Sequence, residues 1–178
     1  MTQPFFFFVS QTPGAAAAGV CLFLCFVAMA CASTGATAQS TSPATGKVTA
    51  DAVTEIAIEH RCSGCANEFE VVLRRDGTAA KTTFGNNRRG TTDRAFVGAV
   101  PVSTFDTLAR AIVSEKFFEL RDEYRDPTIA DSPWVKTTVA TGAQRKSVVD
   151  RDGMGPAALR GLQTRIEQVV NSLSWREK

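Results

Sequence analysis

The chain has 178 residues, a hydrophobic fraction of 44% and a formal net charge of +2, from 20 basic and 18 acidic side chains. This length suits one domain with a core of its own. A charge balance so close to neutral argues against a nucleic-acid-binding protein, which needs clustered positive charge.

The N-terminal segment has the features of an export signal. Residues 1–46 contain no Asp, Glu, Lys or Arg, and an apolar run extends from Ala15 to Ala32. Small residues follow it, and the Ala-Thr-Ala of residues 36–38 fits the pattern that a signal peptidase accepts. We therefore predict a signal peptide over residues 1–38 and a protein that is exported to the periplasm or the cell envelope.

Two other fates of this segment stay open. Cys31 follows a small alanine and is a candidate for lipidation, which would anchor the mature protein to a membrane. The apolar run could also remain as an uncleaved anchor, although its many Ala and Gly residues make it weakly hydrophobic. We expect contact with a membrane only through such an N-terminal anchor.

After the signal, composition predicts a linker and then a single domain. Residues 39–52 are rich in Ser, Thr, Ala and Gly and predict a flexible linker. In the domain that follows, residues 53–178, alternating side chains predict an antiparallel meander. Its four strands are expected at residues 55–59, 69–73, 78–84 and 92–100. Asp76-Gly77 suits a two-residue turn between the second and third strands, and residues 85–90 form a polar loop.

A helix is expected after the meander. Ser103 and Asp106 resemble a capping box, and the helix should end near Glu115 or Phe118. Its apolar residues recur at helical spacing. They are Phe105, Leu108, Ala109 and Ile112.

The last part of the chain predicts a loop, a hairpin and a second helix. Residues 121–133 are polar, contain two prolines and predict the loop. Residues 134–140 and 144–150 predict the two strands of the hairpin. Pro156 suits the first turn of the helix, whose polar side includes Gln163. Its apolar stripe consists of Leu159, Leu162, Ile166, Val169, Val170 and Leu173.

The predicted fold class follows from this order of elements. Four strands, a helix, a hairpin and a second helix favour an α+β fold. We expect an antiparallel sheet with the two amphipathic helices packed on one face, where they cover its apolar side chains.

The sharpest local motif is Cys62-Ser63-Gly64-Cys65. In an oxidising compartment we expect a Cys62–Cys65 disulfide that fixes the turn between the first two strands. A thiol-exchange pair is an alternative, but it would need a helix N-terminus to activate it, and the residues that follow predict a strand. A metal site would add His60, the only histidine, yet no further Cys or His completes its shell. Ala66 stands where haem attachment needs His, and we expect no metal and no cofactor.

Two surface features are candidates for binding. Tyr124, Asp126, Asp131 and Trp134 gather around the proline-containing loop, where binding residues are common. The competing interpretation is a loop that packs on itself around a buried tryptophan. Basic residues crowd the second to fourth strands and predict a solvated sheet face, or else contact with an anionic surface. They are Arg74, Arg75, Lys81, Arg88, Arg89 and Arg94.

The order of these motifs resembles a family of small exported bacterial proteins, domain of unknown function 6438. The resemblance covers residues 54–176. It rests on Cys62, Cys65, Asp76-Gly77, Phe117-Phe118, Tyr124, Asp131-Ser132-Pro133, Lys146-Ser147-Val148, Pro156, Leu159 and Trp175. The cysteine spacing is one residue shorter here, and Ala66 stands where the family has proline. The resemblance implies the fold and export, it favours lipidation of Cys31, and it implies no activity.

The residues contain no catalytic constellation, so we expect a non-enzymatic binding or structural module of the cell envelope. Its partner would be an envelope component or a small ligand. The alternative is a thiol–disulfide active or metal-binding protein that uses Cys62 and Cys65.

Overall fold

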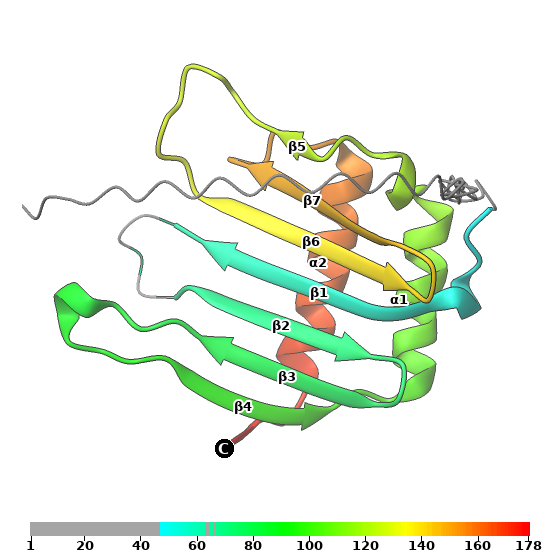
Figure 1. Cartoon of the computed structure of the whole chain (residues 1–178), viewed down its shortest axis with the longest axis horizontal. Coiled ribbons are helices and arrows are strands. Elements are labelled where there is room, and N and C mark those ends of the chain that lie inside the picture. Colours follow the sequence, from blue (N-terminus) through cyan, green and yellow to red (C-terminus); the bar gives the residue numbers. More distant parts are fainter. Residues whose placement is uncertain (1–46, 63–64, 66) are drawn as a thin grey trace, which may run out of the picture. The chain divides into compact units, whose positions relative to one another are not determined.

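A sheet and two helices form the two layers of the computed structural model (Figure 1). The structure describes residues 47–62, 65 and 67–178, and within them eight strands follow the order β5-β7-β6-β1-β2-β3-β4-β8. The strands are β1 Val53–Arg61, β2 Phe69–Arg74, β3 Thr78–Thr83, β4 Arg94–Ala99, β5 Glu123–Tyr124, β6 Trp134–Thr141, β7 Arg145–Arg151 and β8 Arg176–Glu177. The helices are α1 Val102–Ser114 and α2 Ala157–Ser172, and 3₁₀ turns cover Ala50–Ala52, Asn87–Arg89 and Phe117–Glu119.

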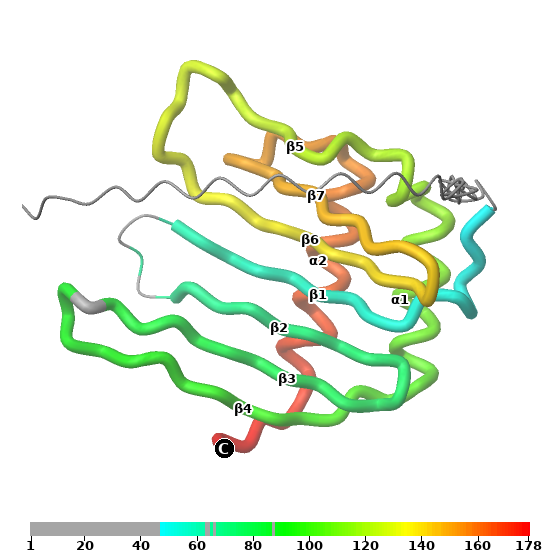
Figure 2. The backbone as a smooth tube through the Cα atoms, in the orientation of Figure 1, coloured from blue at the N-terminus to red at the C-terminus, as the bar shows by residue number. Residues whose placement is uncertain are grey.

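The predicted α+β architecture is confirmed in its main features. Strands β1 to β4 form the antiparallel meander, and β6 and β7 form the second hairpin. The tube in Figure 2 shows this hairpin entering the sheet beside β1, on the side opposite β2. Both helices lie on the same face of the sheet (Figure 1).

The prediction of a purely antiparallel sheet is wrong. The segment predicted as a loop over residues 121–133 contains β5, which pairs with β7 in parallel. At the other edge, β8 pairs with β4, and the amide of Lys178 donates to the carbonyl of Ala95 over 3.0 Å. Each added strand has only two residues, too few to show an alternation in sequence.

The core lies between the sheet and the helices. The predicted apolar positions Phe105, Leu108, Ala109 and Ile112 of α1 are all buried. They meet the inward-facing residues of the central strands, because successive side chains of a strand point to opposite faces. These inward residues include Ile56, Ile58, Val71, Leu73, Val139 and Val148.

Three local predictions are corrected by the structure. The turn between β2 and β3 has three residues rather than two: the amide of Gly77 donates to the carbonyl of Arg74 over 3.1 Å, and only Gly77 has a positive φ, of 88°. This is the three-residue hairpin loop in which glycine takes the left-handed position. Asp76 does not share that conformation, and its Oδ1 instead accepts the amide of Thr78 over 2.9 Å.

The expected capping box at α1 is absent as well. Pro101 occupies the N-cap position without a side-chain hydrogen bond. Asp106 binds Arg75 instead, with Nη1 2.7 Å from Oδ1. The third correction concerns Gln163, predicted on the polar side of α2. It is only 6% exposed, and its Nε2 lies 3.4 Å from Oγ1 of Thr137 on β6, so a buried polar pair joins helix and sheet.

The predicted signal peptide over residues 1–38, Cys31 and most of the linker over residues 39–52 lie outside the described residues. The end of that linker belongs to the fold, because Arg75 donates to the carbonyls of Ala50 and Val53 over 2.5 and 2.7 Å. No helix in the described ranges is long and apolar enough to span a membrane.

Candidate functional site

A cleft of about 460 Å³ lies where β1 and β7 end and β6 begins. The antiparallel register creates it, because Arg61 pairs with Trp134 and Val135 pairs with Asp150. Cys62, Cys65, Asn67 and the residues after β7 complete its walls. We name it the strand-end cleft. The polar and aromatic residues that line it include His60, Cys62, Cys65, Trp134, Asp150 and Asp152.

The structure places both predicted cysteines in the wall of the strand-end cleft. Their Cα atoms are 5.5 Å apart, and their sulfur atoms lie within bonding distance of each other. Cys62 directly follows β1, and its amide donates to Oε1 of Glu68 over 3.2 Å. The pair therefore lies between two strands and not at a helix N-terminus, where the dipole would favour a thiolate.

His60 faces the helices and is held on two sides. Its ring stacks on Phe69, with centroids 4.6 Å apart and planes inclined by 20°. Its Nε2 lies 2.9 Å from Oε1 of Glu167 on α2, but the angle at the N–H is too far from linear for a hydrogen bond. Through this contact His60 places the end of β1 against α2.

Asp150 is the residue of the cleft that sequence reasoning missed. It lies on the inner face of β7 and is only 2% exposed. Its Oδ1 accepts the amide of Gly155 over 2.7 Å. The available signal was the alternation of β7, since Val148 and Asp150 are two residues apart and therefore share one face.

Of the four residues predicted to form a binding loop, the strand-end cleft includes only Trp134. Tyr124 lies in β5, where Arg121 is placed over its ring at 4.6 Å. Asp126 accepts the amide and the hydroxyl of Thr128 over 2.8 and 2.6 Å, and the hydroxyl hydrogen bond lowers the pKa of that carboxyl. Asp131 is exposed.

An ion-pair group on the outer face of the sheet adjoins the strand-end cleft through Arg61. Glu59 is 8% exposed and binds both Lys136 and Arg61, with Nε of Arg61 2.8 Å from Oε1. Arg61 also binds Glu68 over 3.3 Å and lies 3.4 Å from the centre of the Phe84 ring. Burial raises the pKa of Glu59, but the hydrogen bonds from Lys136 and Arg61 outweigh it and hold that pKa below its ordinary value.

We expect this network to make stability depend on pH. A carboxyl whose pKa is lowered by folding stabilises the protein above its unfolded pKa, about 4.3 for glutamate, and this contribution is lost as the pH falls through the folded pKa. Glu59→Gln should lower the free energy of unfolding by about 1–3 kcal/mol at pH 7. The difference from the wild type should shrink below about pH 4. Urea unfolding from pH 3 to 7 measures it.

The matched control for Glu59 is Glu70→Gln. Glu70 lies opposite Glu59 across β1 and β2, and within the described ranges it forms no ion pair. A constant difference between Glu59→Gln and the wild type over the whole pH range would contradict the role given to this network.

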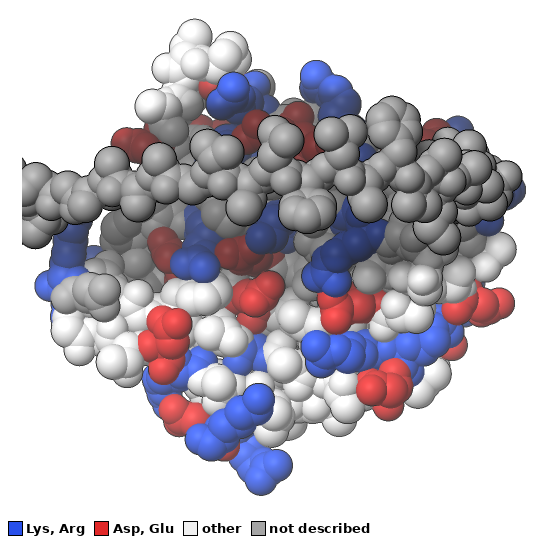
Figure 3. Space-filling view, viewed as in Figure 1, with Lys and Arg blue, Asp and Glu red and all other residues white. Residues whose placement is uncertain are grey.

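The basic residues predicted along β2 to β4 do not form one patch. Arg74 binds Glu55, Arg75 binds Asp106, and Arg94 binds Glu177 over 2.6 Å. On the visible part of the sheet face, Figure 3 shows Lys and Arg interspersed with Asp and Glu. Such mixed charge is typical of a solvated surface.

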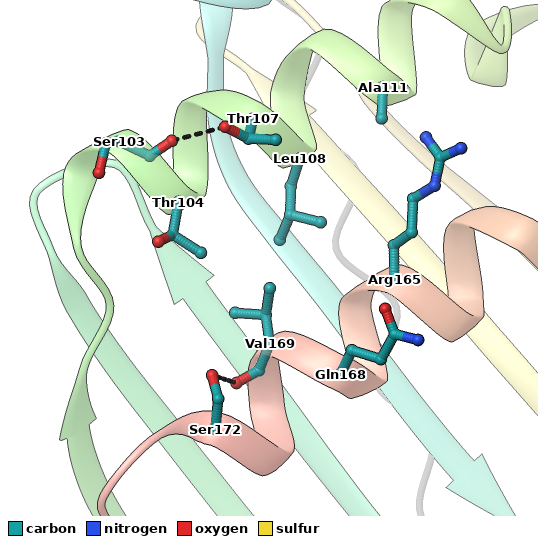
Figure 4. Close-up of a pocket in the computed structure, with 9 residues that line it drawn as sticks. All are labelled: Ser103, Thr104, Thr107, Leu108, Ala111, Arg165, Gln168, Val169 and Ser172. Carbon is teal, nitrogen blue, oxygen red and sulfur yellow. Dashed lines mark hydrogen bonds between the residues drawn. The ribbon is translucent and has the colours of Figure 1, made fainter.

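A second cavity, of about 610 Å³, lies between α1 and α2. Figure 4 shows Arg165 extending from α2 toward Ala111 of α1. Two hydroxyl groups of the lining donate within their own helices: Thr107 donates to the carbonyl of Ser103 over 2.8 Å and Ser172 to that of Val169 over 2.7 Å. Among the described residues, the lining of this helix groove contains no aromatic ring and no carboxylate, unlike that of the strand-end cleft.

Among the described residues, no group of three or more His, Cys, Asp or Glu side chains is arranged to hold a metal ion. The model of a family described as domain of unknown function DUF6438 matches residues 55–170, which include the whole strand-end cleft. The curated proteins contain no match to the chain.

Proposed function

We propose a function from the residues of the strand-end cleft, because the chain belongs to a family described only as domain of unknown function DUF6438. It is a non-enzymatic binding module of the cell envelope that takes a small ligand, or a side chain of an envelope partner, into the strand-end cleft. The observation that carries the proposal is the convergence of Trp134, His60, Asp150 and Asp152 on a cleft of about 460 Å³. Ligand pockets have volumes of about 300–1,000 Å³, with apolar walls and a few polar groups.

The described groups in the cleft favour recognition over catalysis. The sulfur atoms of Cys62 and Cys65 lie within bonding distance of each other, so neither is a free thiolate. His60 is directed at Glu167 and stacked on Phe69, so it is not paired with a nucleophile as a general base would be. An indole ring and carboxylates, by contrast, suit a binding site.

Binding in the cleft is tested by nuclear magnetic resonance of the isotope-labelled mature domain with a library of small molecules. We expect ligands to shift the signals of the cleft residues, the Trp134 indole among them. Trp134→Ala should weaken binding about tenfold or more, because aromatic anchors carry much of the binding energy. Val169→Ala, in the wall of the helix groove, serves as the control and should leave affinity unchanged. Shifts confined to the helix groove would contradict the proposal.

The envelope location rests on the apolar run Ala15–Ala32 and the small residues after it. The intact mass of the protein from its native host tests it. We expect either cleavage after Ala38 or a lipid on Cys31. An unprocessed chain in the cytosol would contradict export.

The alternative function is thiol–disulfide exchange, or metal binding, through Cys62 and Cys65. One observation favours it: Cys65 is exposed and both cysteines line the cleft. The two functions are separated by the variant with serine at both positions. It should retain ligand binding if the protein is a binding module, whereas turnover of a disulfide substrate by the wild type and its loss in this variant would support the alternative.

A further inference from the structure

We infer that the strand-end cleft takes a cationic group, an ammonium or a guanidinium, which Asp150 holds through a charge-assisted hydrogen bond. This inference rests on the proposed function and adds the chemical class of the ligand. It begins from the environment of one buried carboxylate.

Asp150 carries a charge that its surroundings leave incompletely paired. Among the described residues, the hydrogen bond that reaches its carboxylate comes from the amide of Gly155, over 2.7 Å, and no Lys or Arg forms an ion pair with it. An ionised carboxylate offers about four acceptor positions. Burial of a charge is costly unless the charge is paired and hydrogen-bonded. A cation in the cleft would supply what the chain does not.

The start of α2 explains how this charge is tolerated without a ligand. Gly155 lies just before Pro156, the N-cap residue of α2, so the carboxylate lies at the end of the helix where the dipole favours negative charge. This compensation amounts to partial charges and one amide donor, and among the described residues no second hydrogen-bond donor reaches the carboxylate of Asp150. A cation in the cleft could therefore donate a hydrogen bond to Asp150.

Other groups of the cleft also favour a positively charged ligand. Asp152 lines the cleft two residues later, is exposed, and has a left-handed φ of 53°. The ring of Trp134 already has a cation near it, because Nζ of Lys136 lies 5.7 Å from the ring centre, and aromatic faces attract cations. The basic side chains in the lining are His60, which lies against Glu167, and Arg61, whose charge is compensated by Glu59 and Glu68. Among the described residues, Asp150 and Asp152 are the lining carboxylates that form no ion pair, and Arg160, which donates to the carbonyls of Gly153 and Gly155, lies outside the lining.

The test compares three probes of equal chain length: butylammonium, butanol and butyrate. Titrations of the mature domain, followed by nuclear magnetic resonance at low salt, should show that butylammonium shifts the signals of cleft residues such as Gly153. We expect it to bind about tenfold or more tightly than butanol, as a hydrogen bond to a charged group predicts, and butyrate should not bind. N-acetyl-lysine methylamide forms a parallel arm, and its preferential binding would show that the cation is presented by a peptide.

Asp150→Asn gives the decisive variant. Asparagine keeps an acceptor for the amide of Gly155 and removes only the charge, so the fold should persist. Affinity for butylammonium should fall about tenfold or more. Asp93→Asn is the matched control: Asp93 also accepts a glycine amide, that of Gly85 over 2.7 Å, but it lies outside the residues of the cleft. It should leave affinity unchanged. If Asp150→Asn fails to fold, Asp152→Asn serves as the second variant and should weaken binding about threefold.

The outcomes separate this inference from the proposed function. If butanol or butyrate binds the cleft as well as butylammonium does, or if Asp150→Asn retains full affinity, the cationic ligand class is wrong and a cleft-binding module remains. If no member of the small-molecule library perturbs the cleft, both proposals are overturned.

Discussion

Replacing Phe105 by alanine is expected to lower the free energy of unfolding by about 3–5 kcal/mol, the usual cost of removing a buried aromatic side chain. Phe105 is 0% exposed and belongs to the core that α1 shares with the sheet. The total stability of a domain is about 5–15 kcal/mol, so this single change should remove a large fraction of it. Urea unfolding followed by circular dichroism measures the loss.

Val102→Ala on the same helix is the control for Phe105→Ala. Val102 is 51% exposed, and its truncation should change stability by about 0.5 kcal/mol or less. Similar losses for the two variants would mean that α1 does not pack on the sheet through the face described here.

The second large effect is expected from Gly155→Ala. A Cβ at this buried position would lie 2.9 Å from Oδ2 of Asp150 and 2.9 Å from Cδ2 of Leu159. Overpacking of this kind usually costs about 1–3 kcal/mol. The same collision would displace the Asp150 carboxylate from the wall of the strand-end cleft. We therefore expect lower stability together with weaker binding of butylammonium.

Gly161→Ala is the matched control, because it lies inside α2 and a Cβ there would have no neighbour within 4 Å. This change should stabilise the protein by about 0.5–1 kcal/mol through the higher helix propensity of alanine. Unfolding and butylammonium titration of both variants check the two expectations. Unchanged stability and affinity in Gly155→Ala would show that the contact with Asp150 is unimportant.

Much of the fold was predictable because its elements bury one face each. The stripe from Phe105 to Ile112 and the alternation in β2 identified the helix, the strand and the faces that meet in the core. Strands β5 and β8 were not predictable in the same way. Each has two residues, and each depends on a partner that is distant in sequence, as in the pairing of Glu123 with Val149. Such short strands are selected by tertiary contacts and not by local pattern.

The candidate site was predictable only in part. Cys62, Cys65 and Trp134 were recognisable by residue type, and all three line the strand-end cleft. Asp150 was not recognisable as a site residue, because an aspartate before a Gly-containing turn resembles an ordinary turn residue. Its burial depends on the close approach of Gly155, which folding alone brings beside it. The burial of Gln163 was unpredictable for a similar reason, because its partner Thr137 comes from another element.

The position of β1 at the middle of the sheet has a consequence for the kinetics of folding. One neighbour, β2, follows β1 directly in the chain. The other, β6, is distant in sequence, as the pairing of Val53 with Thr141 shows. Closing so long a loop costs entropy before any contact compensates it, and contacts between distant residues slow folding. During synthesis, which begins at the N-terminus, the meander is complete long before β6 emerges. We therefore expect an intermediate in which one edge of β1 is still unpaired and open to wrong partners.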